Sequence, residues 1–443
     1  MPKRVPEPTI RPQERAFLVG VQLRDQEGLL STSESLNELT LLAKTAGLDV
    51  VGSSTQRLNR PNPKTFIGSG KVEEIHALAG DNSADVILFD DELSPRHQRE
   101  LEKAFGEGLR VLDRTALILD IFAQHAKTRE GALQVELAQY EYRLPRLTRA
   151  WTHLARQAGG GGGRAGNVGG VGLRGPGETQ LEVDRREIGR RINHLKGEIE
   201  KVRAHRHRHR ARRKRSRIPV VALVGYTNAG KSTLLNQIAN ADVYVADQLF
   251  ATLDPTTRRV ELPDGHLALL SDTVGFIQKL PTNLVAAFRA TLEEIAEADL
   301  LLHIADITNP CYQAQISAVQ ETLIDIEADH IPVLTVFNKI DSLEHPKNLQ
   351  EGYIQHPDAV ALSALTGEGV ENLLRVIEQR LYETHTQLEV HLPYSEGKLI
   401  SMFHDQGQVD RVEHGNGGVL ISGSIPGRLY AKYQAYLKQQ EIN

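Results

Sequence analysis

The sequence predicts an α/β protein of four parts. A central domain with a phosphate-binding loop follows an N-terminal α/β domain and a long helical hairpin, and precedes a small C-terminal α/β domain. Two observations carry this prediction. A β-branched run at 220–224 leads through a glycine-rich turn into an apolar helix start, which is the order of elements that a phosphate-binding loop needs. Short apolar runs alternate with helical patterns elsewhere in the chain, as expected for parallel strands covered by helices.

The pattern places the domain boundaries in the 443 residues as follows. We expect the N-terminal α/β domain at 1–125, the helical hairpin with a glycine-rich tip and a basic end at 126–217, the phosphate-loop domain at 218–384 and the C-terminal α/β domain at 385–443.

Composition is that of an ordinary globular protein, with 25% charged and 40% hydrophobic residues. The single cysteine, Cys311, excludes a disulfide framework and fits a reducing compartment. No apolar run approaches the ~18 residues that span a bilayer, and the first residues lack the apolar core of a signal peptide. We therefore expect a cytoplasmic monomer without stable membrane insertion.

The net charge of −5 conceals a strong segregation of charge. Residues 143–217 hold 21 Lys and Arg against 6 Asp and Glu. This asymmetry indicates an acidic partner for that part of the chain alone.

The first part of the chain shows apolar runs at 17–21, 50–52 and 86–89 that alternate with helical patterns such as 36–42. A small parallel sheet is the expected result. The segment 65–71 has glycines and a lysine but lacks the spacing of a phosphate-binding loop, so a tight turn that caps a helix is the favoured interpretation.

Two heptad-like series predict a pair of helices that pack along each other. Their members are Leu133, Leu137, Tyr140, Leu144 and Leu147 in one, and Ile188, Ile192, Leu195, Ile199 and Val202 in the other. Pro145 is expected to kink the first helix, since it removes a backbone donor. An antiparallel pair would form a hairpin ~40 Å long or more at 1.5 Å per residue.

The hairpin tip would be the glycine-rich segment 159–177, which carries Arg164 and Arg174. A flexible linker is one interpretation. The other, which we favour, is a nucleic-acid probe, because a backbone with few side chains can lie close to phosphates and bases. The second helix ends in ten Lys and Arg within 201–217, a density that favours RNA binding through counterion release. His205, His207 and His209 do not share a helix face, so a metal site is not expected.

The loop itself predicts a nucleotide site. Glycines let backbone N–H groups converge on phosphate oxygens, Lys231 would reach the β- and γ-phosphates, and the Ser232 hydroxyl would ligate Mg²⁺. The predicted phosphate-contacting residues are Gly225, Tyr226, Thr227, Asn228, Ala229, Gly230, Lys231, Ser232 and Thr233.

Two further segments fall where the switch loops of a GTPase should lie. In the first we expect Thr252 to complete Mg²⁺ coordination once a γ-phosphate is present, with Thr256 and Thr257 as rivals. In the second, Asp272 would act on the Mg²⁺ shell and the Gly275 N–H would meet the γ-phosphate. The predicted site residues here are Phe250, Ala251, Thr252, Leu253 and Asp254, then Asp272, Thr273, Val274 and Gly275. We expect Lys231, Thr252, Asp272 and Gly275 to be the catalytic groups.

Base selection is predicted by two segments that each follow an apolar strand. The Asp341 carboxylate can accept hydrogen bonds from N1–H and the 2-amino group of guanine, both of which adenine lacks. The residues expected around the base are Asn338, Lys339, Ile340 and Asp341, together with Ser363, Ala364 and Leu365. The order of all these motifs predicts a P-loop GTPase (G) domain that hydrolyses GTP with Mg²⁺.

Two positions bear on mechanism. Phe276 stands where many GTPases have a glutamine that orients the attacking water, so slow intrinsic hydrolysis is expected, with a partner or another group ordering the water. Asn228 in the loop favours the hypothesis that K⁺ binds near the phosphates as a second cation.

At this point the chain resembles the HflX family of translational GTPases. The resemblance is carried by the G motifs and by 65–71, 114–122 and 175–182 outside them. It implies a stress-linked factor that binds the 50S large ribosomal subunit and splits ribosomes, with the hairpin tip directed toward the peptidyl transferase region.

Two other functions stay open. One is an RNA-remodelling, helicase-like protein that uses nucleotide hydrolysis on rRNA, and the other is a nucleotide-regulated assembly scaffold with negligible turnover. For the last part of the chain we expect strands at 388–392, 409–412 and 418–423 and a helix near 427–430, without an independent function.

Overall fold

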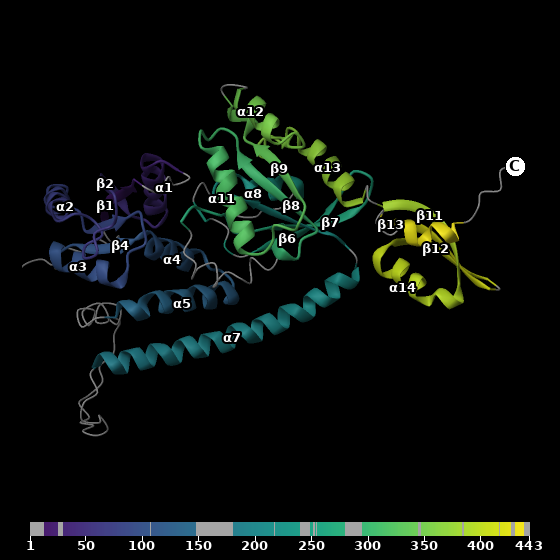
Figure 1. The fold of residues 1–443 in the computed structure, drawn as a ribbon, viewed down its shortest axis with the longest axis horizontal. Coiled ribbons are helices and arrows are strands. Elements are labelled where there is room, and N and C mark those ends of the chain that lie inside the picture. Colours follow the sequence, from purple (N-terminus) through teal and green to yellow (C-terminus); the bar gives the residue numbers. More distant parts are fainter. Residues whose placement is uncertain are drawn as a thin grey trace, which may run out of the picture.

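The computed structural model contains three sheets joined in a row, with a long helix beneath the first two (Figure 1). It describes residues 13–24, 30–106, 108–147, 180–216, 218–239, 249–250, 253, 255–279, 295–343, 347–382, 385–415, 417–426 and 430–437. Within those ranges, no helix combines the length and the apolar character that crossing a membrane requires.

The N-terminal domain is a parallel sheet, as predicted, with four strands in the order β2-β1-β3-β4. Its strands are β1 (Arg15–Leu23), β2 (Asp49–Leu58), β3 (Val86–Phe89) and β4 (Arg110–Asp113). Helices α1 (Thr32–Thr45) and α4 (Arg114–His125) cover one face, and α2 (Ser69–Asp81) and α3 (Pro95–Phe105) the other.

The segment 65–71 forms a tight turn before α2, in agreement with the simpler interpretation of its sequence. Phe66 has a φ of 65°, and the backbone N–H of Gly68, the N-cap of α2, donates to the Gln56 Oε1 at 3.0 Å. The turn therefore connects β2 to α2 and fixes the start of the helix.

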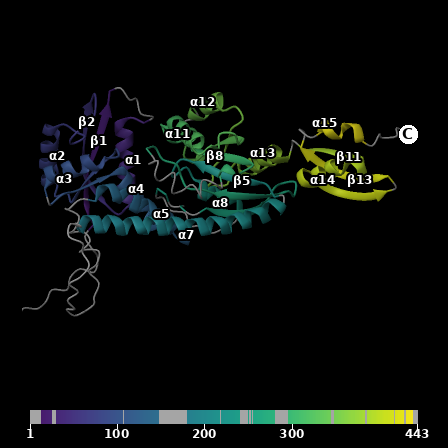
Figure 2. The same ribbon diagram turned by 60° about the horizontal axis from the view of Figure 1, so that its bottom comes forward.

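The predicted pair of helices is α5 (Arg129–Arg143) and α7 (Gln180–Ser216). Leu137 of α5 is buried against Ile192, Leu195 and Ile199 of α7. Arg129 pairs with Glu198 and Glu136 with Arg191, so the two helices are antiparallel. With 37 residues, α7 extends beneath both the N-terminal and the central domain (Figure 2).

The prediction of a kink at Pro145 is wrong, because α5 ends at Arg143 and passes into a short 3₁₀ turn, Leu144–Arg146. The missing N–H of proline and its ring clash terminate the α-helix here rather than bend it. The glycine-rich tip and its two arginines lie outside the described residues, as do the side chains of most of the basic end of α7.

The central domain has a six-stranded sheet in the order β10-β9-β8-β5-β7-β6. All neighbouring strands are parallel except β6, which pairs antiparallel with β7. The strands are β5 (Val220–Gly225), β6 (Thr256–Glu261), β7 (Leu267–Asp272), β8 (Leu300–Asp306), β9 (Val333–Asn338) and β10 (Val360–Ala361). Helices α8 (Lys231–Ala239) and α13 (Val370–Tyr382) pack on one face; α11 (Tyr312–Asp325) packs on the other, and α12 (Lys347–Gln355) lies beside β9.

The C-terminal domain is a three-stranded antiparallel sheet in the order β11-β13-β12. Its strands β11 (His385–Pro393), β12 (Gln408–Gly415) and β13 (Gly418–Pro426) include the three predicted runs. Two helices accompany them, α14 (Gly397–Gln406), which the sequence analysis missed, and the short α15 (Tyr430–Tyr433). Residues 427–429, where the predicted helix was to begin, lie outside the described residues.

Candidate nucleotide-binding site

The phosphate-binding loop connects β5 to α8 at the carboxyl edge of the central sheet. Gly225 has a φ of 152°, and a Cβ added there would lie 2.2 Å from the Ile304 carbonyl oxygen of β8. Gly230 has a φ of 94°, and a Cβ there would lie 2.2 Å from the Asn338 Nδ2. Both positions therefore require glycine, for backbone conformation and for space.

Lys231 is the buried cation of this loop. Its side chain is 6% exposed, and Nζ donates to the carbonyl oxygens of Gly225 at 3.0 Å and Tyr226 at 2.8 Å. An ammonium has three donors, so these two bonds orient it and leave a third for a phosphate oxygen. Burial lowers the pKa of Lys231 to about 8, against the opposing charge of Asp272. A bound phosphate would supply the anion that restores the charged form.

Ser232 and Asp272 meet beside the lysine, where the Ser232 Oγ donates to the Asp272 Oδ2 at 2.6 Å. Asp272 is fully buried at the end of β7, and Thr273 is anchored by a 2.6 Å bond from its Oγ1 to the Leu223 carbonyl oxygen. A hydroxyl next to a carboxylate matches the oxygen ligands that Mg²⁺ prefers, with phosphate oxygens and water as further ligands. Their donor set thus fits the magnesium ion predicted from the sequence.

The first switch segment is only partly described. Phe250 and Leu253 are buried, whereas Ala251, Thr252 and Asp254 lie outside the described residues. The two rival threonines, Thr256 and Thr257, both belong to β6. The Thr257 Oγ1 lies 3.2 Å from the Ser271 Oγ.

The second switch segment packs directly on the phosphate loop. The Thr227 N–H donates to the Phe276 carbonyl oxygen at 2.8 Å, and the Phe276 N–H donates to the Gly225 carbonyl oxygen at 3.1 Å. A Cβ added at Gly275 would lie 2.8 Å from the Thr227 Cγ2 and 3.1 Å from the Lys231 Nζ. Gly275 therefore sits against the group expected to bind the terminal phosphate, and Val274 before it is buried.

Phe276 is 1% exposed and belongs to the apolar cluster that continues into the N-terminal domain. Phe122 of α4 and Phe250 belong to the same cluster, with ring centroids 4.6 Å apart. A buried phenyl ring has no polar atom with which to orient water, and the slow intrinsic hydrolysis expected from this position stays a prediction.

The predicted base-binding residues converge at the ends of β9 and β10. The Asn338 Nδ2 donates to the Ala229 carbonyl oxygen at 2.8 Å, and its Oδ1 accepts from the Ala364 N–H at 2.9 Å. Asn338 thereby ties the base-binding segments to the phosphate loop. Lys339 has a φ of 69°, and its Nζ lies 2.7 Å from the Asp306 Oδ2.

Asp341 is exposed, as a residue that contacts a base should be before nucleotide binds. The Ser363 hydroxyl bonds its carboxylate and, with smaller contributions from Ser342 and Lys339, lowers its pKa. The carboxylate is therefore ionised at neutral pH and can accept hydrogen bonds from guanine. Ile340 begins the 3₁₀ turn that carries Asp341, and Leu365 is 74% exposed.

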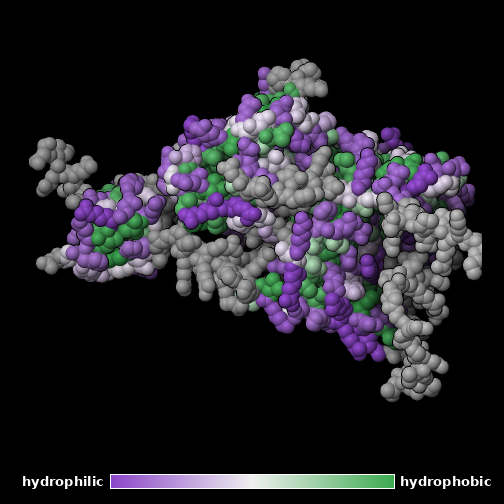
Figure 3. Space-filling model, turned by 180° about the vertical axis from the view of Figure 1, so that it is seen from behind, coloured by the Kyte–Doolittle hydropathy of each residue, from purple (hydrophilic) through white to green (hydrophobic). Residues whose placement is uncertain are grey.

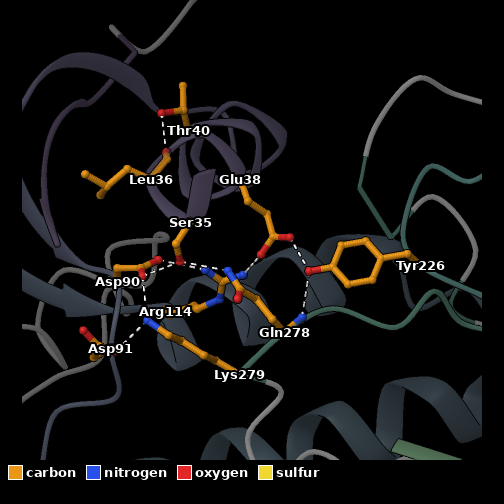
Figure 4. Close-up of polar contacts among 10 residues, drawn as sticks. All are labelled: Ser35, Leu36, Glu38, Thr40, Asp90, Asp91, Arg114, Tyr226, Gln278 and Lys279. Carbon is orange, nitrogen blue, oxygen red and sulfur yellow. Dashed lines mark hydrogen bonds and ion pairs between the residues drawn. The ribbon is translucent and has the colours of Figure 1, made fainter. Parts of the chain in front are cut away.

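A polar network between the N-terminal domain and the nucleotide site was not predicted. The Tyr226 hydroxyl donates to the Glu38 carboxylate, Arg114 pairs with Glu38, and the Arg114 Nη1 lies 2.8 Å from the Asp90 Oδ1 (Figure 4). Arg114 is 1% exposed. Arg114 begins α4, whereas its partners Glu38 and Asp90 lie in α1 and directly after β3, so no motif or periodicity in the sequence indicates them.

Four family models match the chain in succession. They are described as "GTP-binding GTPase N-terminal" at 33–123, "GTP-binding GTPase Middle Region" at 125–213, "50S ribosome-binding GTPase" at 220–339 and "HflX C-terminal domain" at 348–429. The GTPase HflX of Magnetococcus marinus is 47% identical over 92% of this chain and 91% of its own length. The chain belongs to the HflX family. Its activity is accordingly that of a GTPase.

A second curated relative agrees with this assignment. The GTPase HflX of Escherichia coli K12 is 45% identical over 90% of both chains. Among solved structures, a GTP-binding protein from Sulfolobus solfataricus in complex with GDP is similar, with a TM-score of 0.41 and 25% identity over 84% of this chain and 99% of that one. The HflX assignment also agrees with the predicted architecture, a P-loop GTPase domain with further domains on both sides.

Proposed function

We propose that this HflX GTPase binds the 50S large ribosomal subunit and splits or rescues stalled ribosomes under stress, with GTP as the signal that controls its grip. The observation that carries the proposal is that a nucleotide site and an antiparallel helical hairpin with a basic sequence at its end belong to one chain. The "50S ribosome-binding GTPase" model at 220–339 supports the choice of partner.

The hairpin is suited to reach into a ribosomal site because it is stiff. An apolar seam of four buried residues joins α5 to α7, and ion pairs such as Lys196 with Glu141 at 2.9 Å flank it. Figure 3 shows hydrophilic side chains along the lower edge of the molecule, over the described part of the hairpin. We propose that the glycine-rich tip contacts rRNA and that the basic end binds phosphates.

In this proposal Lys231 neutralises the β- and γ-phosphates, Ser232 and Thr252 hold Mg²⁺, and Asp272 orients the Mg²⁺ shell. A Mg²⁺ ion held there would stabilise negative charge on the transferred phosphoryl group. The Gly275 N–H binds the γ-phosphate, and Asn338, Asp341 and the Ser363–Leu365 backbone hold guanine. Asn228, at a φ of 61° in the loop, would hold K⁺.

Phe276 leaves the attacking water without its usual orienting group, so we propose slow intrinsic hydrolysis that the ribosome stimulates. We also propose a cytoplasmic monomer with domain boundaries at 125, 217 and 384.

The test is GTP hydrolysis by the full chain with and without purified large ribosomal subunits. The proposal predicts at least about a tenfold rise in rate, and a smaller rise would count against it. An RNA-remodelling enzyme would instead be stimulated by naked rRNA, which is the second arm of the same assay. A scaffold with negligible turnover would keep its cellular role when Lys231 is replaced by Ala.

A further inference from the structure

The second switch segment contacts two partners at once. Its backbone at Phe276 is bonded to the phosphate loop, as described above, and its next residues reach the N-terminal domain. The Gln278 N–H donates to the Tyr226 hydroxyl at 2.9 Å, and the Gln278 Nε2 donates to the Ser35 Oγ of α1 at 2.8 Å. A shift of this segment therefore has to alter contacts on both sides.

Lys279 completes the contact with the N-terminal domain, at the carboxyl end of β3. Its Nζ lies 2.7 Å from the Asp90 Oδ2 and 2.6 Å from the Asp91 Oδ1 (Figure 4). Asp90 is 2% exposed and also accepts hydrogen bonds from Ser35 and Arg114. A buried carboxylate with several donors holds a cation in one place, so Lys279 is fixed by a site built from three N-terminal elements.

The location of these contacts is informative. In an open parallel α/β sheet, ligands bind outside the carboxyl ends of the strands, where the strand order reverses. In the order β2-β1-β3-β4 that point lies between β1 and β3, beside Asp90. The second switch segment thus occupies the place in the N-terminal domain where this type of sheet holds a ligand.

A terminal phosphate that accepts hydrogen bonds from both Lys231 and the Gly275 N–H would sit about 2.9 Å from each. Gly275 already lies against Lys231, since a Cβ there would be 3.1 Å from the Nζ. A γ-phosphate bound there contacts Gly275 directly, so its binding acts on the segment whose next residues, Gln278 and Lys279, the N-terminal domain holds. GDP, which has no γ-phosphate, lacks this contact.

We propose that Lys279 and the carboxylates of Asp90 and Asp91 are positioning residues that lower the affinity of the protein for GTP relative to GDP. The N-terminal domain and the γ-phosphate compete for the second switch segment. By linkage, GTP weakens the contact of the two domains by the same factor.

The test is the ratio of two dissociation constants, one for GDP and one for a non-hydrolysable GTP analogue, measured on the full chain without ribosomes. Lys279→Met removes the charge and keeps the length of the side chain. The ratio of GTP-analogue affinity to GDP affinity is expected to rise about five- to tenfold, the lower part of the usual range for such coupling. Lys279→Arg keeps the cation and should stay within about twofold of the wild type.

Lys103→Met is the matched control, because Lys103 makes a 2.8 Å ion pair with Glu100 on α3, away from this contact. General damage to the fold would lower both affinities together and leave the ratio unchanged. An unchanged ratio in Lys279→Met overturns the proposal.

The second readout uses the only cysteine in the chain. The Cys311 Sγ, before α11, donates to the Glu34 Oε1 of α1 at 2.5 Å, so the thiol reports whether α1 is docked. The proposal predicts faster thiol labelling with the GTP analogue than with GDP, and equal rates would contradict it. Since no ribosome is present, failure here leaves the ribosomal function untouched.

Discussion

The nucleotide site and the domain contact beside it share the phosphate loop, yet the sequence encodes them differently. The site is made of short segments in which neighbouring residues act together, such as Gly230 to Ser232. The contact joins residues that are 188 and 243 positions apart, Tyr226 with Glu38 and Gln278 with Ser35. Short sequence motifs specify the nucleotide site, whereas the tertiary fold brings together the residues of the domain contact.

Arg114 should show the largest effect, on stability. Arg114→Leu leaves the carboxylates of Glu38 and Asp90 buried without their common cation, and breaking a buried ion pair in this way costs about 3–5 kcal/mol. Chemical denaturation of the full chain would measure the loss. The control is Arg110→Leu, which removes an ion pair with Glu14 whose partners are both about half exposed and should leave the midpoint nearly unchanged. If the two variants lost similar amounts of unfolding free energy, the buried Arg114 network would contribute no more to stability than an exposed ion pair.

Lys231 should show the largest effect on catalysis. Lys231→Ala removes the buried ammonium between the loop carbonyls and the phosphates, and loss of one such electrostatic contact costs about 100-fold or more in rate. Steady-state GTP hydrolysis is the measurement, with Lys339→Ala as a less severe comparison because Lys339 pairs with Asp306. A Lys231→Ala enzyme within tenfold of the wild type would refute the assignment. Nucleotide-free labelling of Cys311 should not change, because the domain contact does not use Lys231.

Asp341 should affect selectivity rather than turnover. Asp341→Asn replaces an acceptor-only carboxylate with an amide, and hydrogen bonds to a charged group contribute about 1.5–3 kcal/mol. The KM for GTP should rise about tenfold or more while kcat changes little. If KM for GTP were unaltered, guanine would have to be recognised elsewhere.

Much of the nucleotide site and the outline of the fold could be predicted from the sequence, for a physical reason. The loop backbone requires glycine at Gly225 and Gly230, and a carboxylate such as that of Asp341 can recognise guanine, so these candidate residues stand out in the sequence. The parallel sheet of the N-terminal domain and the seam of α5 with α7 follow from hydrophobic periodicity, whereas the order of the strands does not.

The parts that were missed or mistaken depend on tertiary contacts. Pro145 could equally kink or end a helix, and the short turn after Arg143 decided the outcome. Arg114 appeared only as part of a family motif, because its partners Glu38 and Asp90 have no fixed spacing from it. The ten-residue helix α14, which lies between two predicted strands, was also overlooked.

Cys311 should show the smallest effect, on thiol reactivity. Burial raises the pKa of the Cys311 thiol to about 11, and the hydrogen bond to Glu34 and its charge add to the shift. Because the thiolate is the reactive form, labelling should be slow near pH 8 and should rise with pH up to about 11. Glu34→Gln removes the smaller contributions, so labelling at pH 8.5 should become several-fold faster. A slower or unchanged rate would mean that Glu34 does not face the thiol.

The central claim is that the terminal phosphate on the nucleotide controls how firmly the hairpin holds ribosomal RNA. The most direct measurement is the affinity of the full chain for purified large ribosomal subunits, with GDP and with a non-hydrolysable GTP analogue. The account predicts binding at least about tenfold tighter with the analogue, a coupling within the usual range. Equal affinity with the two nucleotides would contradict it.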